Sequence, residues 1–120
     1  MTHDDFNKVT SNRFAKCWDT LIAKSTEYAT DSDRLYNFKQ AAAMQNITPE
    51  AALIGMLSKH LVSIFDLVNG IAHDHHKPVE AGDEKIGDAV NYLILLEGLI
   101  VERYKGGDAR DDESDDESFN

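Results

Sequence analysis

Cysteine, basic residues and strand-like alternation are scarce in this chain, and each scarcity excludes a class of protein. The single cysteine, Cys17, excludes an internal disulfide and fits a reducing cytosol. Lysine and arginine number 12 against 22 aspartates and glutamates, a net charge of −10, so we expect no direct contact with nucleic acid. The N-terminal residues MTHDDFNK are too polar for a signal peptide. We therefore expect a cytoplasmic protein.

No segment alternates apolar and polar residues as a strand would, and apolar residues recur instead at spacings of three and four. This pattern predicts four helices, at 12–29, 33–45, 49–69 and 83–105. The clearest start signal is Thr48-Pro49-Glu50, with a capping residue, a proline at the first helical position and an acidic residue in the first turn. Gly70 predicts the end of the third helix.

The fourth predicted helix is apolar around nearly its whole circumference. The apolar residues are Val90, Leu93, Ile94, Leu95, Leu96, Leu99, Ile100 and Val101. Glu97 and Gly98 interrupt them, so we do not expect a membrane span. Neighbours must cover such a helix on several sides, so either the first two helices wrap it or a second subunit covers it. We predict an all-α four-helix bundle, built on a long antiparallel hairpin of the third and fourth helices and completed as a homo-oligomer.

The chain divides into three parts by composition. Residues 1–11 read as a polar N-terminal lead-in, and residues 12–105 hold the predicted helical bundle. Residues 106–120, GGDARDDESDDESFN, form an acidic tail with too few apolar side chains to fold by itself.

Carboxylates on the predicted hairpin form a candidate metal site. On the third helix Asp66 shares a face with Lys59, and on the fourth helix Glu84 and Asp88 share a face with Asn91. An antiparallel hairpin brings Asp66 towards Glu84 and Asp88, and three carboxylates suit Mg²⁺, which prefers oxygen ligands and binds phosphates. The alternative is that Lys59 and Asp66 simply face water.

Asp88 is the most informative of these carboxylates. It lies on the same helix face as Leu95 and Leu99, where an uncompensated charge would be costly. A metal ion is one form of compensation, and a salt bridge to Lys59 or Arg34 is the other.

Cations and aromatic residues surround the turn between the first two predicted helices. They are Lys24, Tyr28, Arg34, Asn37 and Phe38. Cations can hold phosphates, and an aromatic ring can stack on a base, so this cluster is a candidate ligand site together with Lys59 and Asn91. The alternative is that the aromatic residues belong to the core and the cations face water.

Two other features have simpler explanations. His73-Asp74-His75-His76 could bind a transition metal, but adjacent histidines point apart in most backbones, so we expect a polar loop. His60 lies at the edge of an apolar face and is expected to be half-buried, and Cys17 is expected to pack in the core.

The hairpin and the phrase EKIGDAVNYLILLEGL resemble the all-α nucleoside triphosphate pyrophosphohydrolases of the MazG-like superfamily. Small phage proteins of the nucleotide-modification-associated type look closer still. They pair a K-x-x-x-Y…NF stretch with a D-x-x-N-Y helix, here Lys24, Tyr28, Asn37, Phe38, Asp88, Asn91 and Tyr92. The resemblance covers roughly residues 15–105. It implies a phage protein in a host cytosol, a nucleotide ligand and Mg²⁺ at Asp66, Glu84 and Asp88.

The sequence departs from the superfamily pattern at the expected metal ligands. Lys85 stands where the E-x-x-D motif needs its glutamate, and Lys59 and His60 stand where the preceding helix carries a glutamate cluster. Of the pattern only Asp88 transfers directly. The first hypothesis is therefore a nucleotide-binding protein related to these enzymes, and the alternative is a non-catalytic acidic protein that inhibits or engages a host defence factor.

Overall fold

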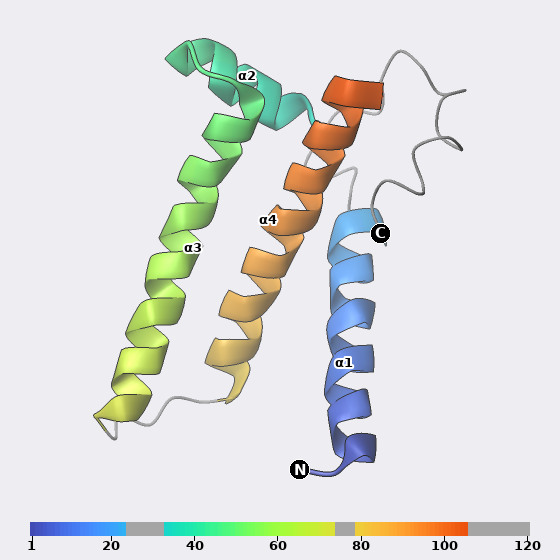
Figure 1. The fold of residues 1–120 in the computed structure, drawn as a ribbon, viewed down its shortest axis with the longest axis vertical. Helices are drawn as coiled ribbons and strands as arrows, with labels where there is room; N and C mark the ends of the chain where they lie inside the picture. The colour runs from blue at the N-terminus through green and yellow to red at the C-terminus, as the bar shows by residue number, and fades with distance from the viewer. Residues whose placement is uncertain (24–32, 74–78, 106–120) are drawn as a thin grey trace.

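The computed structural model describes residues 1–23, 33–73 and 79–105, which are helical over most of their length. The elements in order are α1 (His3–Trp18), a π-helical turn η1 (Asp19–Ala23), α2 (Tyr36–Gln45), α3 (Pro49–Ala72) and α4 (Val79–Lys105) (Figure 1). Within these ranges there is no β-strand. The predicted all-α fold with four helices is confirmed.

The first helix begins much earlier than predicted. The Thr2 hydroxyl accepts a hydrogen bond from the backbone N–H of Asp5 at 3.0 Å, and Asp4 and Asp5 lie in the first turn. The cap and these acidic residues stabilise a helix start at His3. The predicted start at residue 12 was therefore wrong, because the apolar repeat begins later than the helix itself.

The ends of α3 illustrate a correct and an incorrect prediction. The Thr48 hydroxyl accepts from the Ala51 N–H at 3.1 Å with proline at the first helical position, as expected. Gly70 does not end the helix, which continues to Ala72. Gly70 is buried within α3, and its carbonyl accepts from the N–H of His73 at 3.2 Å. The predicted end of the helix at Gly70 was therefore wrong by two residues.

The three long helices lie side by side, and α4 is in the middle (Figure 1). The α3 helix runs antiparallel to α4 and forms the predicted hairpin, α1 runs parallel to α4 on its other side, and α2 crosses one end. The core lies at that end. Phe38, Leu53, Leu57, Ala89 and Leu99 form it, and Leu53 is fully buried.

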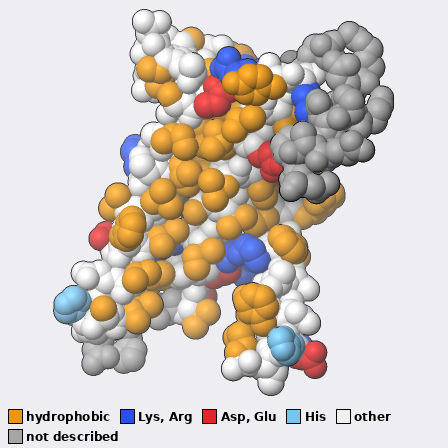
Figure 2. Space-filling view, viewed as in Figure 1, with side chains coloured by type: hydrophobic (Ala, Val, Ile, Leu, Met, Phe, Trp, Pro, Cys, Tyr) orange, Lys and Arg blue, Asp and Glu red, His pale blue; other side chains and the backbone are white. Residues whose placement is uncertain are grey.

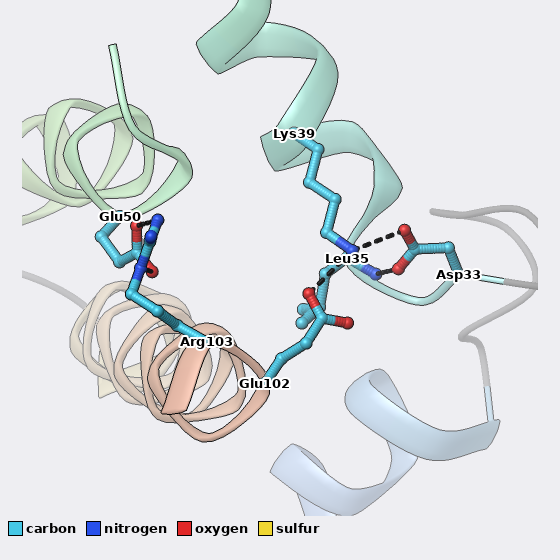
Figure 3. A network of polar contacts seen from close by, with 6 residues as sticks. All are labelled: Asp33, Leu35, Lys39, Glu50, Glu102 and Arg103. Carbon is cyan, nitrogen blue, oxygen red and sulfur yellow. Dashed lines mark hydrogen bonds and ion pairs between the residues drawn. The ribbon is translucent and has the colours of Figure 1, made fainter. Parts of the chain in front are cut away.

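Ion pairs fix the helices at the end where α2 crosses (Figure 3). Arg103 of α4 donates two hydrogen bonds to the Glu50 carboxylate of α3, at 2.8 and 2.7 Å. The Lys39 ammonium of α2 lies 2.8 Å from Asp33 Oδ2 and 2.7 Å from Glu102 Oε1. The hydrogen bonds from Arg103 hold the pKa of Glu50 below its usual range, and those to Asp33 and Glu102 raise the pKa of Lys39.

A second group of charges joins α1 to α4. Asp83 accepts from Lys16 Nζ at 2.6 Å and from Arg13 Nη2 at 2.5 Å, and the Arg13 guanidinium also donates to the Asp83 carbonyl at 2.9 Å. The Lys16 hydrogen bond and the nearby Arg13 charge lower the pKa of Asp83. Gly87 leaves room for this arrangement, because a Cβ there would meet Arg13.

One side of α4 stays uncovered by the other helices. Leu93 is 52% exposed, and Ile94, Ile100 and Val101 are each exposed to more than two-fifths. The first two helices therefore do not wrap α4, which was one of the two predicted ways to bury it.

Within the described ranges, α3 is the one helix long and apolar enough to cross a membrane by length and composition, with a mean hydropathy of 1.6.

Candidate functional site

A cavity of about 290 Å³ lies where α2, α3 and α4 meet η1. Its lining residues are Thr20, Leu21, Arg34, Asn37, Phe38, Met56, Asp88, Asn91, Tyr92 and Leu95. The volume falls near the lower end of the range of small-molecule sites, about 300–1,000 Å³. A few polar groups converge on an otherwise apolar and aromatic wall, which is the usual composition of a ligand pocket.

Two helices supply most of the polar wall. Asp88, Asn91 and Leu95 follow one another at spacings of three and four, so the helical repeat places them on one face of α4. Arg34 lies in the turn before α2, and Asn37 and Phe38 lie in the first turn of α2. The crossing of α2 over α4 brings the two sets together.

Asn91 provides the strongest sign of a missing interaction. Within the described residues, its Oδ1 is a buried side-chain atom that has no hydrogen-bond partner. An unsatisfied buried acceptor costs about 1–3 kcal/mol, and proteins seldom keep one without a reason. A ligand N–H group would satisfy it if the Asn91 side chain turned its Oδ1 towards the cavity that it lines.

An aromatic cluster adjoins the polar wall. The Tyr92 ring meets the Phe38 ring edge-to-face, with centroids 6.3 Å apart, and lies 4.9 Å from the His60 ring at an interplanar angle of 35°. His60 Nδ1 is 3.6 Å from Asp88 Oδ2, which forms an ion pair when the imidazole is protonated. His60 thus contacts both Asp88 and Tyr92 from the α3 side, and it is half-buried as predicted.

Basic and acidic side chains balance in this cavity, and acidic ones outnumber basic ones in the cavity beside it. Arg34 and Asp88 are the two charged residues that line the cavity. A second cavity of about 450 Å³ shares Thr20, Asp88 and Asn91 with the first one. Its charged lining consists of Arg13 and Lys16 against Asp19, Asp83, Glu84 and Asp88. These charges disfavour a ligand that carries several negative charges.

The structure brings together half of the predicted site residues. Those that line the first cavity are Arg34, Asn37, Phe38, Asp88 and Asn91. Glu84 lines the second cavity. Lys24 and Tyr28 lie outside the described residues.

Lys59 and Asp66 do not join the site. Each follows a core-facing residue, Leu57 or Ile64, by two positions, which turns its side chain about 200° away around the helix. Both are exposed, as the water-facing alternative predicts. Across residues 1–23, 33–73 and 79–105, no group of three or more His, Cys, Asp or Glu side chains is placed to hold a metal ion.

Asp88 differs from its expected setting in two ways. Its side chain is 44% exposed, although the next residue, Ala89, belongs to the core. The ion-pair partner of Asp88 is His60 and neither Lys59 nor Arg34, so the salt-bridge alternative named the wrong cation. Tyr92 and His60 were not predicted as site residues, although Tyr92 belongs to the D-x-x-N-Y pattern and His60 was placed at the edge of an apolar face.

The remaining predictions fall elsewhere. Cys17 is 4% exposed and packs in the interior, as expected. His73 is exposed at the end of α3, where its Nδ1 lies 2.9 Å from the Asn69 carbonyl oxygen, and the rest of the histidine-rich loop lies outside the described residues. The acidic tail at 106–120 also lies outside the described residues.

Comparison with known proteins finds no matching family model, no matching curated protein and no matching solved structure. The resemblance to the MazG-like superfamily therefore stays a prediction from the sequence.

Proposed function

We propose that this protein binds a nucleoside or a nucleoside monophosphate in the cavity between α2, α3 and α4. The observation that carries the proposal is the unpartnered Oδ1 of Asn91, buried beside Arg34, Asn37 and Asp88. Nucleobases present N–H donors and ring acceptors in one plane, and an amide oxygen is a suitable acceptor for such a donor.

The other lining groups fit the remaining parts of this ligand. Tyr92 offers aromatic surface to a base, and the buried Phe38 ring packs edge-to-face against it. Arg34 makes no hydrogen bond or ion pair within the described part of the chain, so its guanidinium is available to a single phosphate. Asp88 can accept from a ribose hydroxyl, and His60 Nδ1 lies 3.6 Å from the same carboxylate.

The charge balance is the reason to propose a monophosphate over a triphosphate. One guanidinium faces one carboxylate in the first cavity, and the second cavity holds more carboxylates than cations. The Mg²⁺ that would offset a triphosphate needs ligands that are not grouped within the described residues. We therefore propose binding and leave pyrophosphate hydrolysis as a prediction from the family resemblance.

A thermal-shift screen tests the proposal. Nucleosides and nucleoside mono- and triphosphates are compared with and without Mg²⁺, because any ligand that binds the folded state raises the melting temperature. We expect a monophosphate to raise the melting temperature more than the triphosphate with the same base. In the Arg34→Gln variant, the shift given by either nucleotide should fall to the shift given by the free nucleoside. No shift with any base would refute the proposal.

The alternative function as a partner of a host protein depends on the acidic tail. That segment lies outside the described residues, so no contact in the structure favours it. Deleting residues 106–120 should leave nucleoside binding unchanged if the proposed cavity is the functional site.

A further inference from the structure

Exposed apolar side chains follow a heptad repeat along both helices of the hairpin. On α4 the positions are spaced four and three apart and hold Ile86, Val90, Leu93, Glu97, Ile100 and Tyr104, here named the α4 seam. On α3 the same spacing holds Ile54, Ser58, Leu61, Phe65, Val68 and Ala72, here named the α3 seam. Repeats of this kind are typical of helices that pack on partner helices in a coiled-coil manner.

The side chains of these seams reach solvent. Phe65 is 73% exposed, Val68 is 56% exposed and Leu93 is 52% exposed, although each belongs to a regular helix that packs on a neighbouring helix. A continuous group of large apolar side chains on a protein surface is typical of a site where a partner binds.

The two seams lie on the same face of the hairpin. Ile54 follows the core residue Leu53 by one position, and Val90 and Ile100 follow the core residues Ala89 and Leu99 in the same way. Each seam is thus rotated about 100° from the core in the same sense, and in two antiparallel helices that rotation leads to one common face. Figure 2 shows apolar side chains gathered over α3 and α4 on one face.

The charge of this face indicates what covers it. Glu97 is the one charged residue among the seam positions, and none of them is lysine or arginine. A chain with a net charge of −10 repels its own copy over most of its surface, and two copies can approach along seams that hold a single charged residue each at most. An anionic membrane surface would instead be matched by lysine and arginine around the apolar side chains.

We propose that two copies of this chain associate through the α3 and α4 seams, related by a twofold axis, so that four long helices form one shared core. Such an interface is self-complementary, because each copy offers the same pair of seams. Glu97 is a polar residue in an otherwise apolar repeat, and such residues fix the register of a helix pair at a cost in affinity.

This association leaves the proposed ligand cavity open. Asp88 follows Ile86 by two positions and Asn91 precedes Leu93 by two, so each lies about 160° around α4 from its seam residue. The interface therefore does not depend on the proposed function, and either one can fail without the other.

Sedimentation equilibrium of the full chain tests the interface. The wild type should sediment at about 27 kDa, twice the 13.4 kDa of one chain. Leu93→Glu and Leu61→Glu should each raise the dissociation constant of the dimer by at least about tenfold, as expected for central residues of an interface. Met44→Glu is the matched control, because Met44 is 87% exposed on α2, away from both seams, and it should leave the dimer intact.

Three results would overturn the proposal. They are a monomeric wild type at all concentrations, a dimer that resists both seam variants while helical content is retained, and sedimentation of the wild type with anionic vesicles that the seam variants abolish.

A further variant tests the register of the two helix pairs. Glu97→Leu should lower the dissociation constant about tenfold, since it removes the polar interruption of the seam. An unchanged or weaker dimer would place Glu97 outside the interface and contradict the proposal.

Discussion

Replacing Asn91 by leucine should stabilise the protein in the absence of ligand. The buried Oδ1 of Asn91 lacks a partner within the described residues, and such an atom costs about 1–3 kcal/mol of the free energy of unfolding. Leucine has nearly the same size and shape and carries no polar atom. Allowing for imperfect packing, we expect a gain of about 1 kcal/mol, which shifts the melting temperature of a domain of this size by about 4–8 °C.

The same substitution should abolish the response to a nucleoside. Thermal melts of the wild type and Asn91→Leu, each with and without nucleoside monophosphate, measure both effects. Asn12→Leu is the control, because Asn12 is exposed on α1 and its replacement should change stability by less than about 0.5 kcal/mol. If Asn91→Leu melts lower than the wild type, the amide has a structural partner and the reasoning from an unsatisfied acceptor is refuted.

Three further predictions concern the stability of the fold. Leu53→Ala should lower the free energy of unfolding by about 2–5 kcal/mol in a urea titration, because Leu53 is fully buried, and Val9→Ala on exposed α1 should cost far less. Gly55→Ala should raise it by about 0.5–1 kcal/mol, since no atom lies within 4 Å of the added Cβ; a loss would indicate an unseen contact. The cation partners of Glu50 and Asp83 lower the pKa values of these two carboxyl groups. The stability that the two groups give the fold is therefore present above the ordinary carboxyl range of about pH 4 and is lost as the pH falls through the lowered pKa values. Melting curves between neutral and acidic pH should show this loss, and it should be smaller in Glu50→Gln.

Local signals in the sequence predicted the helices well where they were strong. The Thr48-Pro49 start of α3 was confirmed because capping and proline geometry act within one turn. The start of α1 at His3 was missed because its first turns carry polar residues, and its stability comes from the Thr2 cap and from docking on α4. That docking depends on Asp83, far away in the sequence.

The candidate site was predictable only in part for the same reason. Arg34, Asn37 and Asn91 were identified by type, and the crossing of α2 over α4 brings them into one cavity. Asp66 was predicted beside Asp88 because both lie near the same loop. Its rotation around α3 depends on which side of α3 packs on α4, and two positions along a helix are enough to turn a side chain to the opposite face.

The most direct test of the proposed function is an NMR titration that follows the side-chain amide of Asn91. Addition of a nucleoside monophosphate should shift the Asn91 side-chain resonances in a saturable manner, together with the backbone resonances of Arg34 and Phe38. The side chains of Asn12 and Asn69, which are exposed on α1 and α3, should not move. Saturable shifts confined to other parts of the chain, or none at all with any base, would contradict a nucleotide site in this cavity.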